Sequence, residues 1–149
     1  MYDVQNIRAD FPILSQQVNG KPLVYLDNGA SAQKPNVVID AINTAYAAEY
    51  ANVHRGLHTL STISTETYEG VRAKIARFLT VPSEDSIILN SGTTEGINMV
   101  SYGWAAPRMQ AGDEIILSIM EHHANIVPWH FLRERLGVVI KWVDVDSNG

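Results

Sequence analysis

Residues 86–94 read Ser-Ile-Ile-Leu-Asn-Ser-Gly-Thr-Thr. The first five predict a short apolar strand, and the glycine–threonine turn opens a helical stretch that we expect from about Thr94 to Trp104. Further strands are expected at 114–118 and 138–143, with a helix over 126–136 between them, capped by Asn125 and Gly137. Alternating strands and helices predict an α/β fold with a parallel sheet, and the unbroken apolar strands fit burial on both faces.

The residues before this stretch predict an arm and two helices. Residues 1–22 form the expected arm, with a helical piece near 4–9 and a polar turn at Asn19-Gly20. We expect a helical segment over 23–85 and the first βαβαβ part of a large domain over 86–149. Pro35 is expected to open the first helix. The second is expected over 64–79, and its predicted buried stripe consists of Tyr68, Val71, Ile75 and Phe78.

Composition excludes several classes of protein. The chain has 149 residues, 46% apolar and 18% charged, which is typical of a folded globular domain and not of a disordered chain. It has no cysteine, so it holds no disulfide, thiolate nucleophile or Cys-ligated metal. Its formal net charge is −5 with scattered basic residues, which argues against nucleic acid as a partner. The sequence has no apolar run of ~20 residues and no leader pattern at its start, so we expect a cytoplasmic protein without a membrane partner.

Two loops follow carboxyl ends of predicted strands, where ligands of parallel sheets bind. They contain Gly92-Thr93-Thr94 and Glu121-His122-His123, and they face one crevice if their strands are neighbours. The glycine turn, the threonine hydroxyls and the helix N-terminus suit a phosphate, and the alternative is that Thr93 only caps the helix. His122 and His123 are either structural histidines or place one imidazole against a planar ligand. We expect no metal, since HExxH spacing is absent and adjacent side chains of an extended segment point to opposite sides.

A third candidate segment is the loop around His54-Arg55-Gly56-Leu57-His58. The ordinary interpretation is a structural loop with two histidines. The alternative is that Arg55 binds a carboxylate or phosphate through two parallel hydrogen bonds.

Four segments in order resemble one family: residues 25–35 (YLDNGASAQKP), 53–61 (VHRGLHTLS), 91–98 (SGTTEGIN) and 120–129 (MEHHANIVPW). The arm 8–14 (RADFPIL) matches as well. Together they resemble the N-terminal part of a Suf-type cysteine desulfurase, within the class-V aminotransferase group of pyridoxal-phosphate (PLP) enzymes of fold type I. The resemblance covers nearly the whole chain, and it implies the start of a mainly parallel sheet with flanking helices.

The resemblance assigns roles to residues of this chain. It implies that Thr93 and Thr94 hold the PLP phosphate and that His122 stacks on the pyridine ring. Ala30, His54 and Arg55 match segments that border the substrate site. Implied partners are L-cysteine, a sulfur-acceptor protein of the Suf system and a second copy in a homodimer. Two departures, Ser91 where many relatives carry a basic residue and Gly29 where Ala or Ser is frequent, leave substrate preference open.

The family's two catalytic side chains have no match here. Its PLP-linked lysine follows Ser-Gly-His, which none of Lys21, Lys34, Lys74 and Lys141 does, and the persulfide-forming cysteine is absent. The resemblance therefore implies the N-terminal portion of an enzyme that converts L-cysteine to L-alanine and enzyme-bound persulfide for iron–sulfur cluster assembly. We expect the 149 residues alone to be inactive and poorly soluble. Alternatives are a selenocysteine lyase or another class-V PLP enzyme, and, in a different class, a non-catalytic phosphate-binding or interaction module.

Overall fold

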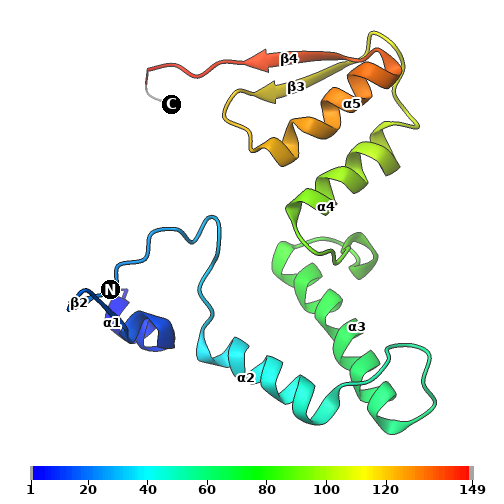
Figure 1. Ribbon diagram of the computed structural model, residues 1–149. Helices are drawn as coiled ribbons and strands as arrows, with labels where there is room; N and C mark the ends of the chain where they lie inside the picture. The colour runs from blue at the N-terminus through cyan, green and yellow to red at the C-terminus, as the bar shows by residue number, and fades with distance from the viewer. Residues whose placement is uncertain (1, 148–149) are drawn as a thin grey trace. The chain divides into compact units, whose positions relative to one another are not determined.

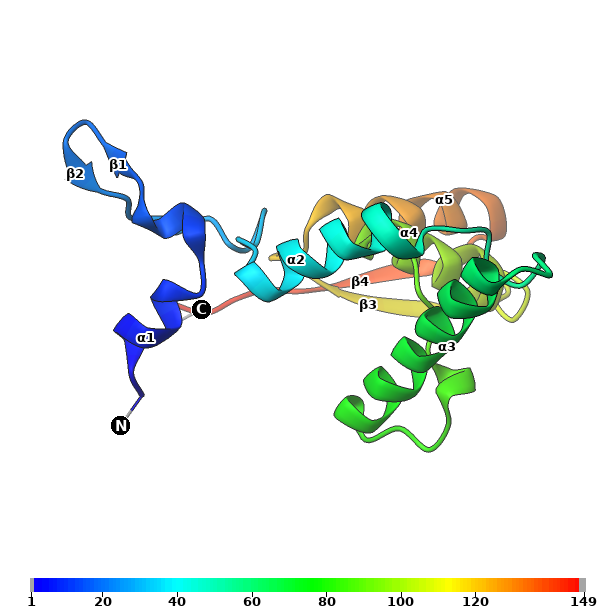
Figure 2. The same ribbon diagram turned by 90° about the horizontal axis from the view of Figure 1, so that it is seen from below.

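The computed structural model describes residues 2–147, which belong to two compact units, Met1–Ser86 and Ile87–Gly149. The first unit begins with α1 (Val4–Ala9), the 3₁₀ turn η1 (Pro12–Ser15) and a hairpin of β1 (Gln17–Val18) and β2 (Lys21–Pro22), visible in Figure 2. It continues with α2 (Asn36–Thr44), the π-helical turn η2 (Ala45–Glu49), α3 (Thr59–Leu79) and the 3₁₀ turn η3 (Glu84–Ser86). Figure 1 shows these helices in sequence order along the chain.

The arm forms by local hydrogen bonds. The Asp3 carboxylate accepts the amide N–H groups of Gln5 and Asn6 at 3.1 and 3.0 Å and so caps α1. Asn19 and Gly20 both have positive φ, 55° and 74°, as a two-residue hairpin turn between right-twisted strands requires. The predicted helical piece and polar turn of the arm are confirmed.

Helix α3 differs from its prediction in two ways. It begins at Thr59 and not near residue 64, because the His58 Nδ1 atom accepts the Ser61 amide N–H at 3.3 Å and caps the helix. The predicted buried stripe is wrong: Tyr68, Val71 and Phe78 are exposed, Phe78 by 86%. A helix stripe is buried only where a second element covers it, and among the described residues no element covers this one.

The second unit is a small parallel sheet with helices. Its elements are α4 (Thr93–Asn98), the π-helical segment η4 (Met99–Ala105), β3 (Glu114–Ser118), the 3₁₀ turn η5 (His123–Asn125), α5 (Val127–Leu136) and β4 (Val139–Val143). β3 and β4 pair in parallel from Glu114↔Val139 to Ser118↔Val143, and α5 is the crossover between them (Figure 1). Ala105, Leu132 and Val138 form the buried cluster. The predicted strands and helices after residue 92 are confirmed, with β3 at its predicted bounds and Gly137 closing α5.

Three sequence predictions for this part of the chain are wrong. The strands are not buried on both faces, since Ile116 of β3 is 70% exposed and Val143 of β4 is 51% exposed; burial on both faces needs a covering layer on each side of the sheet. Residues 87–90 form no strand, and the only parallel sheet among residues 2–147 has two strands. A strand exists only when a neighbouring strand accepts and donates its backbone hydrogen bonds, and within residues 2–147 neither β3 nor β4 pairs with this segment. Asn125 is not the N-cap of α5; Ile126 takes that position because Asn125 closes the preceding turn η5.

Among residues 2–147, the helices are too short or too polar to cross a lipid bilayer.

Candidate functional site

A cavity of about 270 Å³ lies in the second unit, between α4 and the start of α5. It brings together Thr94 and His122, two of the residues that the sequence singles out. It is lined by Thr94, Asn98, His122, His123, Ala124, Val127, Pro128 and Phe131. One wall is therefore polar and the other apolar, as in sites for a planar ligand with an anionic group.

The turn before α4 is built for close backbone approach. Gly92 has φ 140° and ψ 172°, a conformation that essentially only glycine adopts. The Asn90 side-chain oxygen accepts the Gly92 amide N–H at 2.9 Å and fixes this turn. Helix geometry leaves the first N–H groups of α4 without carbonyl partners, so they are available to an anion. Thr93 begins α4, is exposed and does not line the cavity.

Glu95 lies in the first turn of α4 and is bound to the same turn. Its carboxylate accepts the Ser91 amide N–H at 2.7 Å and the Ser91 hydroxyl. These bonds, the hydroxyl first and the backbone amide second, hold the pKa of Glu95 below its ordinary value of 4.5. The ionised carboxylate thus connects Ser91, before Gly92, with the first turn of α4, after it, by hydrogen bonds.

His122 has a defined tautomer. Its Nδ1 atom accepts the Ala124 amide N–H at 3.1 Å, so a neutral ring carries its proton on Nε2. The His123 ring lies edge-on to it, with centroids 6.2 Å apart. No cluster of three metal-ligating side chains occurs among the described residues.

The loop that carries His122 is held by side-chain hydrogen bonds among Glu121, Asn125 and Trp129. The Glu121 carboxylate accepts a hydrogen bond from the side-chain NH2 group of Asn125 at 2.9 Å. The side-chain oxygen of Asn125 accepts from the Trp129 Nε1–H at 2.9 Å. The sequence reasoning missed Asn98 and Phe131 as lining residues. Asn98 could have been predicted as a lining residue, because it lies four residues after Thr94 and residues four apart share a helix face.

The cavity fits the cofactor that the resemblance implies. It offers a hydroxyl, an imidazole with a fixed tautomer and an apolar wall, the groups that a phosphorylated aromatic ring requires. No lysine is among its lining residues, so the described part of the cavity supplies contacts and not a covalent link.

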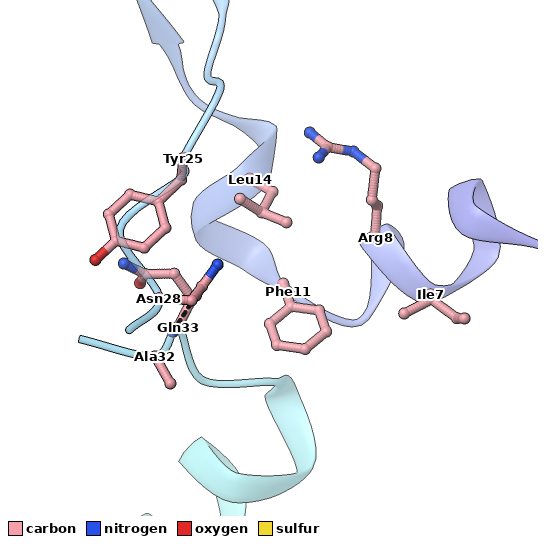
Figure 3. Close-up of a pocket in the computed structure, with 8 residues that line it drawn as sticks. All are labelled: Ile7, Arg8, Phe11, Leu14, Tyr25, Asn28, Ala32 and Gln33. Atoms are coloured by element: carbon pink, nitrogen blue, oxygen red, sulfur yellow. Dashed lines mark hydrogen bonds between the residues drawn. The ribbon is translucent and has the colours of Figure 1, made fainter. Parts of the chain in front are cut away.

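The predicted substrate segments lie in the first unit, where two hollows differ in character. One, about 280 Å³, is lined by His54, Gly56, Ser61, Thr62, Thr65 and Glu66. The other, about 450 Å³, lies between the arm and the segment that follows it and is lined by Ile7, Arg8, Phe11, Leu14, Tyr25, Asn28, Ala32 and Gln33 (Figure 3). Ala30 lines neither of these hollows; it belongs to the exposed turn after Asp27, whose carbonyl accepts the Ala30 amide N–H at 3.2 Å. The structure therefore does not bring Ala30 together with His54.

Comparison with known proteins agrees with this geometry. The class-V aminotransferase family model matches residues 24–149. The chain is 52% identical over 148 residues to a cysteine desulfurase of Salmonella gallinarum, covering 99% of this chain and 36% of that protein. Its structure resembles those of cysteine desulfurases from Thermococcus onnurineus (TM-score 0.88, 31% identity, covering 100% of this chain and 35% of that one) and Escherichia coli (TM-score 0.78, 39% identity, 99% and 36%). The chain spans about a third of the length of these proteins. It belongs to the class-V aminotransferase family.

Proposed function

We propose that this chain supplies the phosphate- and ring-contacting part of a PLP-dependent cysteine desulfurase, which converts L-cysteine to L-alanine and enzyme-bound persulfide sulfur. The observation that carries the proposal is the shared cavity of Thr94 and His122. Support comes from the 52% identity to a cysteine desulfurase and from the family, which is PLP-dependent.

The chain's own residues have distinct tasks in this proposal. Thr94 and the first amides of α4 bind the phosphate, and the ring of His122 lies against the pyridine. Thr93 lies outside the cavity lining, and its contact with the phosphate rests on the resemblance alone. The Ala124 amide keeps the His122 proton on Nε2, so Nε2–H is available to donate to substrate or cofactor. Val127 and Phe131 exclude water from one side. Bound PLP acts as an electron sink for the bonds of an amino-acid substrate.

The complete reaction needs groups that these 149 residues do not contain. A thiolate must attack the substrate sulfur, and the sequence has no cysteine. We therefore assign the lysine, the cysteine, the homodimer interface and the contact with a Suf-type sulfur acceptor to further residues, and propose iron–sulfur cluster assembly in the cytoplasm as the setting. The coding frame beyond codon 149 tests this directly: it should encode Ser-Gly-His-Lys and later a cysteine. A stop codon there favours a non-catalytic phosphate-binding module.

Thr94 provides the sharpest test of the cofactor site. In the protein from the complete reading frame, Thr94→Ala should weaken PLP binding about tenfold, because a hydrogen bond to a charged group is lost. Thr94→Ser should bind like the unaltered protein. Thr67→Ala, a threonine substitution on the exposed surface of α3, is the matched control. PLP is measured by equilibrium dialysis, and equal affinity of the Thr94→Ala and Thr67→Ala variants contradicts the proposal.

Substrate choice separates the desulfurase from related enzymes. The same protein should release alanine from L-cysteine faster than from L-selenocysteine or L-cysteine sulfinate. Faster release from selenocysteine identifies a selenocysteine lyase instead. The 149-residue chain with added PLP should release none.

A further inference from the structure

The turn that carries Arg55 is held in an unfavourable backbone conformation. His54 has φ 65°, a left-handed conformation that costs a residue with a bulky side chain about 1 kcal/mol or more. Arg55 follows it, with its amide N–H donating to the Val53 carbonyl at 2.9 Å. Such a conformation persists only where surrounding contacts determine it.

Those contacts come from one helix, α3. The Thr65 hydroxyl accepts the His54 amide N–H at 2.9 Å, and the buried Ser61 hydroxyl accepts the Gly56 amide N–H at 3.0 Å. The backbone is thus fixed on both sides of Arg55. The Arg55 side chain is exposed, and within residues 2–147 it has no hydrogen-bond or ion-pair partner of its own.

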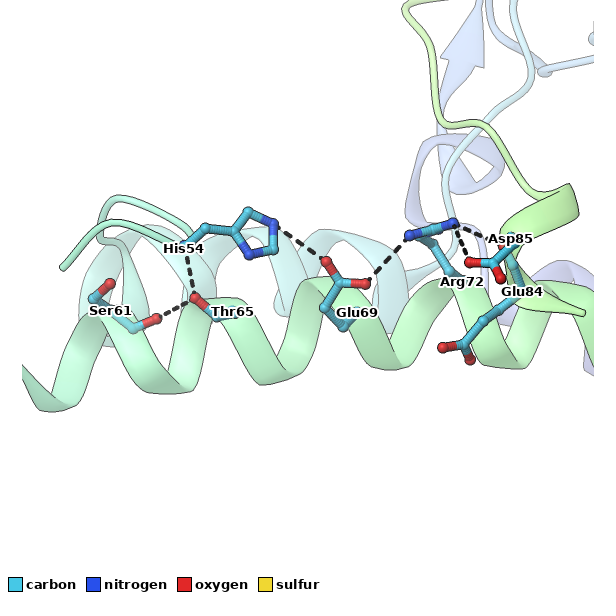
Figure 4. Close-up of polar contacts among 7 residues, drawn as sticks. All are labelled: His54, Ser61, Thr65, Glu69, Arg72, Glu84 and Asp85. Carbon is cyan, nitrogen blue, oxygen red and sulfur yellow. Dashed lines mark hydrogen bonds and ion pairs between the residues drawn. The ribbon is translucent and has the colours of Figure 1, made fainter. Parts of the chain in front are cut away.

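Glu69 holds the same turn through the His54 side chain. Its Oε1 atom lies 3.2 Å from His54 Nε2, and its Oε2 atom lies 3.4 Å from an Arg72 guanidinium nitrogen (Figure 4). Thr65 and Glu69 are four residues apart on α3, so they contact the turn from one helix face. The Tyr68 ring meets the His54 ring edge-on, with centroids 5.8 Å apart.

Arg72 orients the Glu69 carboxylate. Its second guanidinium nitrogen donates to the Glu84 carbonyl at 2.9 Å and lies 3.8 Å from the Asp85 carboxylate. A guanidinium bound at both ends keeps the carboxylate in one rotamer, with one oxygen directed to His54 (Figure 4). Each oxygen of Glu69 therefore faces a nitrogen atom of a different side chain.

We infer that Glu69 is a positioning residue, which holds the His54 side chain so that the turn presents Arg55 to the carboxylate of an amino-acid substrate. Its role for substrate rests on the proposed function, whereas its role in ordering the turn does not. Glutamine at position 69 has the same shape but no negative charge. The ion pairs that the carboxylate makes with His54 and Arg72 are therefore lost.

Trypsin cleavage after Arg55 measures the order of the turn in the 149-residue chain. Glu69→Gln should speed cleavage of the Arg55–Gly56 bond about fivefold, the effect of one partly exposed ion pair on local opening. Cleavage after Arg133, on α5 of the other unit, should stay unchanged. Asp40→Asn on α2 is the matched control, since Asp40 is exposed, lies away from the hollow of His54 and makes no ion pair within the described residues. Equal cleavage after Arg55 in the two variants overturns the inference.

A second variant covers the case in which Glu69→Gln also speeds cleavage after Arg133 and so loosens the whole chain. His54→Asn tolerates positive φ but is too short to reach Glu69. It should speed cleavage after Arg55 alone, and unchanged cleavage overturns the inference.

Kinetics in the protein from the complete reading frame separate the two parts of the inference. Glu69→Gln should raise KM for L-cysteine about fivefold and change kcat less than about twofold, because the turn acts in binding. Faster cleavage after Arg55 with an unchanged KM overturns the role for substrate and keeps the ordering of the turn. Loss of PLP binding in the Thr94→Ala variant, by contrast, bears only on the proposed function.

Discussion

Gly56 is a position where the structure leaves no space for a side chain. A Cβ atom there would lie 2.5 Å from both Cβ and Oγ of Ser61, which is buried and also donates to the Asn52 carbonyl at 2.6 Å. Gly56→Ala should therefore lower the free energy of unfolding by about 1–3 kcal/mol, as overpacking does. Urea unfolding followed by far-ultraviolet circular dichroism measures the change.

Gly70 provides the control for this substitution. It lies inside α3, and a Cβ atom there would meet nothing within 4 Å. Gly70→Ala should raise the free energy of unfolding by about 0.5–1 kcal/mol, because alanine loses less backbone entropy in a helix. A destabilisation of equal size in both variants contradicts the role given to Gly56.

The glycine turn before α4 should respond to acid through Glu95. The hydrogen bonds from Ser91 lower the pKa of this carboxyl group in the folded chain, so the stabilisation is present above pH 4.5 and is lost as the pH falls through the lower folded value. The Ser91 amide resonance, followed by NMR, should therefore shift with a midpoint below pH 4.5. Glu95→Gln should abolish that shift, and a midpoint above 4.5 contradicts the assignment.

Among the helices and strands, the features that depend on neighbouring residues in the sequence were predicted correctly more often than those that depend on contacts with distant segments. β3 and Gly137 at the end of α5 follow from apolar runs and capping rules, and both are where the sequence places them. The start of α3 could not be predicted from the sequence, because His58 caps the helix and histidine is not among the preferred N-cap residues. The predicted strand at 86–90 failed for another reason. Whether residues 86–90 pair with another strand depends on the rest of the sheet, and their own sequence does not determine it.

The exposed apolar side chains of α3 lead us to predict that the isolated 149-residue chain associates with itself. Phe78 is 86% exposed and Leu79 56%, and Tyr68 and Val71 are exposed on the same helix. Contiguous apolar surface of this kind drives association. Sedimentation velocity should show concentration-dependent association of the 149-residue chain, and Phe78→Lys should reduce it. A monodisperse monomer for the unaltered chain contradicts this expectation.

For the molecule as a whole, the candidate site could be predicted only in part. Thr94 and His122 line one cavity, as expected, although only His122 follows a strand, β3, while the strand predicted before Thr94 is absent. Asn98 and Phe131 were missed, since a cavity wall is a product of packing. Glu69 was missed because one of its two partners, His54, lies on another segment of the chain; the other, Arg72, is three residues further along α3. The roles in binding of Thr93, Thr94, His122, Ala30, His54 and Arg55 all stay predictions.

The anchoring of the Arg55 turn to α3 has a consequence for the order in which the protein assembles. The hydrogen bonds between residues 49–56 and the side chains of Ser61, Ser64 and Thr65 join positions only 5 to 15 residues apart. Contacts over such short separations form quickly, because little chain entropy is lost in closing the loop. The Arg55 turn therefore needs only residues 49–65 to order, and no contact with the parallel pair β3–β4. We expect this turn to order earlier in folding than the cavity between α4 and α5.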